Sequence, residues 1–127
     1  MVGRKLFLMT LVLVLIPSPA PADTIYVSPE DTLTIRTAII WSSPGDEIVL
    51  RDGVFTGPGN RDLSLMGKNI TVRSESNDPT LCIIDCEGTS TDFHRAFMLQ
   101  EGEGAEALIS GITITNGNHT WGGGFRA

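Results

Sequence analysis

Two cysteines in one short segment are the first residues whose chemistry can be considered. Cys82 and Cys86 lie in the run LCIIDC, where apolar and polar positions alternate as in a strand. Along an extended strand they would lie about 13 Å apart at ~3.3 Å per residue, whereas the Cα atoms of a disulfide lie within roughly 7 Å of each other. A disulfide would need a turn at Ile83–Asp85. Buried free thiols and an intrachain disulfide both remain open interpretations.

Histidines and tryptophans are the other side chains that could bind or react. His94 and His119 do not have the spacing from the two cysteines that a zinc site requires, so no metal site is predicted. Trp121 lies in a glycine-rich turn and is the best candidate for stacking on a sugar ring, although packing over a loop is the plainer interpretation. Gly122–Gly124 lack the following lysine of a phosphate-binding loop. We predict no catalytic residue and no bound cofactor.

The N-terminal segment Met1–Ala22 has the pattern of a signal peptide. Arg4 and Lys5 are basic, Leu6–Ile16 is apolar apart from one threonine, and Ala20-Pro21-Ala22 supplies small residues at a cleavage site. This apolar run is shorter than the roughly 20 residues that span a bilayer. We predict cleavage after Ala22, export from the cell and no membrane span in the cleaved chain, with a retained N-terminal anchor as the alternative.

Residues 23–127 would form one acidic domain. The whole chain has 9 basic and 15 acidic residues, and loss of Arg4 and Lys5 leaves 7 basic residues and a net charge of −8. Nucleic-acid binding is excluded, because phosphate contacts depend on clustered Lys and Arg. Anionic lipid surfaces are disfavoured for the same reason. Neutral or cationic partners are compatible with this negative charge.

Most of the chain after residue 46 consists of short alternating segments separated by polar turns. Ile70 and Val72 share one face, and Ile112 and Ile114 alternate with threonines in the same way. We predict about eight short strands, and Gly122–Phe125 would begin another. They are Thr24–Ser28, Ile48–Leu50, Val54–Phe55, Leu63–Leu65, Ile70–Ser74, Leu81–Cys86, Phe97–Leu99 and Leu108–Thr115. Their recurrence favours stacked coils of roughly 20–30 residues, with an antiparallel sandwich as the alternative.

One amphipathic helix is predicted, over Leu33–Ser42. Its apolar face follows helical spacing and comprises Ile35, Ala38, Ile39 and Ser42. Asp31 or Thr32 would cap its first turn. Because so short a helix is not stable alone, it must pack on an apolar surface.

Four phrases of the sequence occur in a characteristic order. They are Thr34–Val49 followed by Gly53–Phe55, Lys68–Ser74, Cys82–Gly88, and Ile112–Gly117 with Gly122–Gly124. Together they resemble the N-terminal part of a right-handed parallel β-helix of the pectin-lyase-like superfamily. The similarity is to exported, repeat-bearing bacterial β-helix proteins, and it covers nearly all of Thr24–Phe125.

The resemblance implies an all-β solenoid in which the helix caps the first coil, with Leu33 beside the three apolar face residues on the core. Members of this group continue for many more coils. We therefore expect 23–127 to be an incomplete domain, truncated after about three coils. Its open end would be covered by missing C-terminal coils or by end-to-end self-association.

For function, the resemblance implies an exported bacterial module, secreted, periplasmic or on the cell surface. Its role would be structural, adhesive or glycan-binding, with polysaccharide or cell-surface components as partners and no catalysis by this fragment. The alternative is the N-terminal scaffold of a polysaccharide lyase or glycoside hydrolase. Related lyases bind calcium through carboxylates and use a basic residue, for which Asp85, Glu87 and Arg73 are the candidates. No motif connects these three residues, so we interpret them as solvated surface charge and predict no calcium site.

Overall fold

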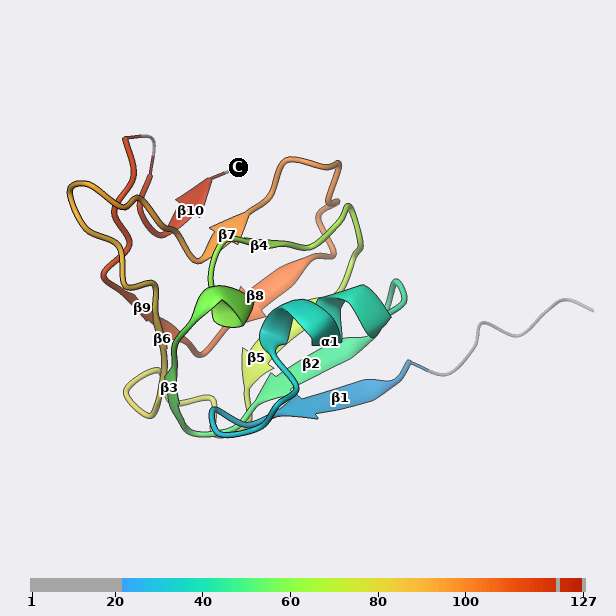
Figure 1. The fold of residues 1–127 in the computed structure, drawn as a ribbon. Coiled ribbons are helices and arrows are strands. Elements are labelled where there is room, and N and C mark those ends of the chain that lie inside the picture. The colour runs from blue at the N-terminus through green and yellow to red at the C-terminus, as the bar shows by residue number, and fades with distance from the viewer. Residues whose placement is uncertain (1–21, 121, 127) are drawn as a thin grey trace, which may run out of the picture.

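The computed structural model describes residues 22–120 and 122–126, in which the strands form three parallel sheets (Figure 1). Sheet A contains β1 (Thr24–Val27), β2 (Glu47–Leu50), β5 (Thr71–Ser74) and β8 (Leu108–Ser110). Sheet B contains β3 (Gly53–Phe55), β6 (Cys82–Asp85) and β9 (Thr113–Thr115). Sheet C contains β4 (Leu63–Ser64), β7 (Phe97–Met98) and β10 (Phe125–Arg126). The predicted signal peptide, except Ala22, lies outside the described residues.

Each successive passage of the chain adds one strand to each sheet. The chain runs through β2, β3 and β4, then β5, β6 and β7, then β8, β9 and β10. Stacked partners repeat in register, as in Phe55 beside Ile84 and Ile84 beside Ile114. Every pairing between two of the ten described strands is parallel, and the single antiparallel bridge, His94 with Asn118, lies outside them, so the antiparallel sandwich is wrong for these residues.

Apolar residues of β1 to β9 face a common core. Ile70 and Val72 are buried on one side of their segment, as predicted, while Thr71 and Arg73 are partly exposed. The fully buried side chains of largest volume come from all three sheets and the helix, and include Phe55, Phe97, Ile35, Ile39, Ile48, Leu50, Leu63, Leu65 and Ile84. The alternating pattern therefore predicted the buried faces correctly.

Helix α1 (Ile35–Trp41) is shorter at both ends than its predicted range. Ile35, Ala38 and Ile39 are buried as expected. The prediction of Asp31 or Thr32 as the capping residue is wrong, because the helix begins later. The cap is Thr34, whose side-chain oxygen accepts a hydrogen bond from the backbone N–H of Thr37 at 3.3 Å.

Contacts distant in sequence hold α1 beside β1, β2, β4 and the 3-10 helix η1 (Pro58–Asn60). The buried side chain of Asn60 accepts a hydrogen bond from the Ile35 backbone N–H at 3.0 Å and donates one to the Thr56 carbonyl at 2.8 Å. One side chain thus joins the start of the helix to the loop after β3. Figure 1 shows α1 next to η1.

Lys68 caps the other end of α1. Its Nζ donates to the carbonyls of Ile39 at 2.8 Å and Ser42 at 2.7 Å, at the end of the helix where carbonyls lack a following turn of N–H donors. The Ile39 carbonyl also accepts from the Ser42 hydroxyl at 2.7 Å. We expect Lys68→Met to lower the free energy of unfolding by about 1–2 kcal/mol, the range for charged hydrogen bonds and a cation at a helix C-terminus. Urea denaturation measures the change.

The matched control for that variant is Arg51→Met, because Arg51 is an exposed cation 3.9 Å from Glu75. An exposed pair of this kind contributes about 0–1 kcal/mol. Equal losses of stability in the two variants would contradict the capping role of Lys68.

The segment Leu108–Thr115, predicted as one strand, is two strands in different sheets. β8 pairs with β5 in sheet A, and β9 pairs with β6 in sheet B. Gly111 lies between them with φ +68°, a conformation that favours glycine. A Cβ atom there would lie 2.5 Å from Ser74 Oγ, so glycine also allows close approach to the preceding passage of the chain. With this division and β10, the described residues contain ten strands where about eight were predicted.

Candidate functional site

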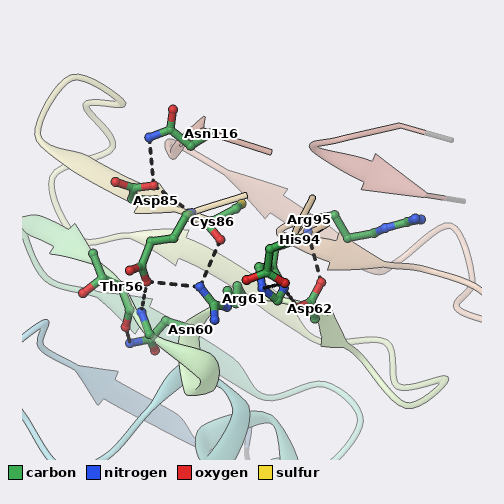
Figure 2. Close-up of polar contacts among 12 residues, drawn as sticks. Thr56, Asn60, Arg61, Asp62, Asp85, Cys86, His94, Arg95 and Asn116 are labelled. Atoms are coloured by element: carbon green, nitrogen blue, oxygen red, sulfur yellow. Dashed lines mark hydrogen bonds and ion pairs between the residues drawn. The ribbon is translucent and has the colours of Figure 1, made fainter. Parts of the chain in front are cut away.

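Charged and amide side chains gather where the chain passes from sheet B to sheet C (Figure 2). They come from the end of β6 and from the loops that follow β3, β6 and β9, strands that are paired with one another in sheet B. Asp85 accepts a hydrogen bond from Asn116 Nδ2 at 3.0 Å. Arg61 Nη1 lies 3.3 Å from both the Cys86 carbonyl and the Glu87 carboxylate. These contacts connect successive passages of the chain.

His94 lies between two carboxylates at this corner. Its Nδ1 is 2.6 Å from Asp62 Oδ2, and its Nε2 is 3.1 Å from Asp92 Oδ1. A cationic imidazole donates a hydrogen bond from each nitrogen and would satisfy both carboxylates. The other oxygen of Asp62 accepts from the Arg95 backbone N–H at 3.0 Å. The arrangement fixes the loop before β7 on the loop before β4.

A pocket of about 280 Å³ lies between α1 and β4. Its lining combines apolar side chains with a carboxylate, a hydroxyl and a guanidinium, and consists of Arg36, Ile39, Ile40, Asp62, Ser64 and Met66. Arg36 is held there because its Nη2 donates to the Arg61 carbonyl at 2.7 Å and to the Asp62 carbonyl at 3.3 Å. Such a mixture of apolar wall and few polar groups is typical of small-molecule sites.

Sequence reasoning missed this pocket because its two walls are distant in the chain. The available signal was Ile40, which departs from the buried face of the helix and is exposed, as is Met66 after β4. Neither residue alone indicates a pocket.

Both cysteines are free and fully buried, and both side chains belong to the core. Cys82 begins β6 and Cys86 follows its end, so the intervening residues form a strand. Burial, and secondarily the charge of Asp52, raises the pKa of Cys82 to about 11. Burial, with the charges of Asp62 and Asp85, raises the pKa of Cys86 to about 11.

We expect these thiols to be unreactive in the folded protein, since the thiolate is the nucleophile. Alkylation at pH 8 should proceed only through unfolding and accelerate in urea. The pKa of each thiol in the folded protein lies above the ordinary value of 9.0. Because the folded state therefore retains the thiol protons more strongly than the unfolded state, the stability is at its full value below pH 9 and is lost as the pH rises toward 11. From pH 9 to 10 the free energy of unfolding should fall by about 2 kcal/mol for the two thiols together.

Immediate alkylation of the folded protein by iodoacetamide at pH 8 would contradict the burial of both thiols. The Cys82→Ser and Cys86→Ser variants serve as controls, because each leaves one thiol whose alkylation can be counted by mass.

The three residues considered for lyase-like chemistry are not brought together. Arg73, on sheet A, forms an ion pair with Glu47. Asp85, on sheet B, instead contacts Asn116 and the backbone N–H of Glu87. Glu87 pairs with Arg61.

The segments that carry the two histidines lie side by side, because the backbone N–H of Asn118 donates to the His94 carbonyl at 2.9 Å. The His119 ring lies 5.8 Å from that of Phe93, centroid to centroid, while His94 contacts the two aspartates. In the described part of the chain no group of three or more His, Cys, Asp or Glu residues has the arrangement of a metal site. Across 22–120 and 122–126, helices fall short of the length and hydropathy needed to cross a bilayer. Trp121, the candidate for glycan stacking, lies outside the described residues.

No protein-family model, curated protein or solved structure matches this chain.

Proposed function

We propose that this chain is an exported structural or glycan-binding module, built as the capped first coils of a right-handed parallel β-helix of the pectin-lyase-like kind. The observation that carries the proposal is the regular addition of one strand to each of three parallel sheets. Right-handed connection is the expected hand, because about 98% of parallel crossovers have it. Connections of this hand throughout would make the solenoid right-handed.

The position of α1 supports a capped first coil. The helix packs against β1, β2 and β4, the strands at or next to the N-terminal edges of sheets A and C. Its buried Ile35 and Ile39 belong to the common core. A helix placed there covers apolar side chains that no earlier coil would cover.

At the other end, β8, β9 and β10 are the outermost strands of their sheets. Leu108 and Phe125 on these strands are exposed. We propose that further coils cover these edges, with end-to-end association of two copies as the alternative. Light scattering of the exported chain separates the two, because only self-association gives a concentration-dependent mass.

The pocket between α1 and β4 is the glycan-contact site that we propose. A sugar ring has an apolar face suited to Ile39, Ile40 and Met66, and hydroxyls suited to Asp62 and Ser64. The volume of about 280 Å³ is close to the lower limit of small-molecule sites, about 300 Å³, and suits one sugar unit. The opposite charges of Arg36 and Asp62 favour a neutral glycan.

The test is a titration of the exported chain with neutral oligosaccharides, followed by NMR chemical shifts. Ile40→Glu should weaken binding at least about tenfold, or 1.4 kcal/mol. Val54→Glu is the matched control, because Val54 is exposed to a similar extent on β3 and does not line the pocket. Absence of binding, or equal loss in both variants, would contradict the site. Cleavage of the oligosaccharides would favour the alternative of an enzyme scaffold.

A further inference from the structure

The carboxylate of Asp46 binds two backbone N–H groups at the start of sheet A. Its Oδ2 accepts from Ser43 N at 2.7 Å, in the turn after α1, and its Oδ1 accepts from Asp23 N at 3.0 Å. Asp46 is buried. Its pKa is lowered by the hydrogen bonds from Ser43 and Asp23, so the carboxylate is ionised at neutral pH.

The Asp23 nitrogen is held at this carboxylate by the strand ladder. The Asp23 carbonyl accepts a hydrogen bond from Glu47 N at 2.9 Å, and Thr24 is paired with Glu47. The nitrogen belongs to the peptide bond between Ala22 and Asp23, where the sequence predicts cleavage of the signal peptide.

We propose that cleavage after Ala22 creates an α-ammonium group on Asp23 that forms an ion pair with Asp46, so that processing fastens β1 to the fold. The inference rests on the proposed export. In the cleavage, a peptidase uses water to break the C–N bond: the hydroxyl joins the Ala22 carbonyl carbon, and a proton joins the Asp23 nitrogen. The new amine takes a second proton near neutral pH, since the ordinary pKa of an α-amino group is about 7.7–8.0.

The surrounding charges direct this ammonium to Asp46. The side chain of Glu47 is already paired with Arg73. Lys68 contributes positive charge near Asp46, but its Nζ donates to helix carbonyls. The carboxylate of Asp23 itself is exposed. The uncleaved chain offers Asp46 a neutral N–H at the same position, whereas the cleaved chain offers a full charge in an environment partly removed from water.

The test compares the processed chain before and after acetylation of its α-amine. An acetyl group keeps one N–H in the place of the original peptide bond, so it removes the positive charge together with the two further N–H donors of the ammonium. At pH 6.5 acylating reagents favour an α-amine over a lysine side chain, because the ordinary pKa of an α-amino group is about 7.7–8.0 and that of a lysine about 10.4, and peptide mass verifies the product. At that pH acetylation should raise the unfolding equilibrium constant about two- to tenfold. The difference should disappear near pH 10, where the α-amine is neutral.

Asp46→Asn should abolish the effect of acetylation, whereas the matched variant Glu47→Gln should retain it. If Asp46→Asn does not fold, the pKa of the α-amine is measured in the folded wild-type chain instead. That pKa should exceed 8.0, the top of the ordinary range. No effect of acetylation, an effect that persists in Asp46→Asn, or an α-amine pKa of 8.0 or less would overturn the proposal.

A separate experiment distinguishes failure of the export proposal from failure of the ion pair. The full-length chain is expressed in an exporting bacterial host, and the mass of the product locates its first residue. A product that does not begin at Asp23 would contradict the processing step. The same chain released from a fusion partner directly before Asp23 would still show whether an ammonium there pairs with Asp46.

Discussion

Replacing Phe97 with alanine is expected to lower the free energy of unfolding by about 3–5 kcal/mol, the range for truncating a buried phenylalanine. Phe97 is fully buried on β7, the middle strand of sheet C. Its partners in register are Leu63 on β4 and Phe125 on β10. Its ring stacks on that of Phe125 with centroids 5.5 Å apart. The variant would remove contacts with the strands on both sides.

Phe93→Ala is the control for that prediction, because it removes the same side chain from an exposed position before β7. Its cost should not exceed about 1 kcal/mol. Thermal melting followed by circular dichroism measures both variants, with about 4–8 °C expected for each kcal/mol in a domain of this size. Similar losses in the two variants would contradict the stacking of sheet C.

Arg95→Met is expected to stabilise the protein by about 1–4 kcal/mol. Arg95 is only 2% exposed, and its Nη1 has no hydrogen-bond partner among the described residues. Its side chain extends away from Asp62 and His94 (Figure 2). An unpaired buried charge is costly because it loses hydration without a compensating interaction. Methionine has a similar length and fills irregular spaces in a core.

The control variant is Arg36→Met, which removes a guanidinium that does donate hydrogen bonds, to the carbonyls of Arg61 and Asp62. That change should destabilise the protein by about 1–2 kcal/mol. Urea midpoints of the two variants should therefore move in opposite directions. A loss of stability in Arg95→Met would mean that the guanidinium has a favourable partner.

The sequence predicted those features of the fold that depend on local patterns. Alternation placed Cys82, Ile84 and Cys86 on one face, and all three are buried. Helical spacing placed Ile35, Ala38 and Ile39 on the inner face of α1, where they are buried. Both patterns reflect the periodicity of side chains along a strand or a helix, which a sequence displays directly.

Features that depend on contacts between distant segments could not be predicted. The inward-facing positions change phase at Gly111, since Ile109 packs on the core before it and Ile112 and Ile114 after it. The pairing of the two halves of Leu108–Thr115 with β5 and β6 is nevertheless a contact between distant segments. Lys68 reaches the end of α1, and Asp46 reaches the Asp23 nitrogen, through chain passages that only the stacked sheets bring together. The pocket between α1 and β4 escaped prediction for the same reason.

The in-register stacking of parallel strands is the central claim, and engineered disulfides test it most directly. Thr71 on β5 pairs with Leu108 on β8, and Arg73 pairs with Ser110. Partner Cα atoms on adjacent strands lie about 4.8 Å apart, within the roughly 4.4–6.8 Å of disulfides. An offset of two residues places them more than about 7 Å apart. Native Cys82 and Cys86 are buried and should not compete.

The measurement is the rate of disulfide formation under mild oxidation, followed by mass, in two double variants. Thr71→Cys with Leu108→Cys should form its disulfide at least about ten times faster than Thr71→Cys with Ser110→Cys, as the distances predict. Equal rates, or faster closure of the offset pair, would contradict the stacked parallel register and with it the proposed solenoid.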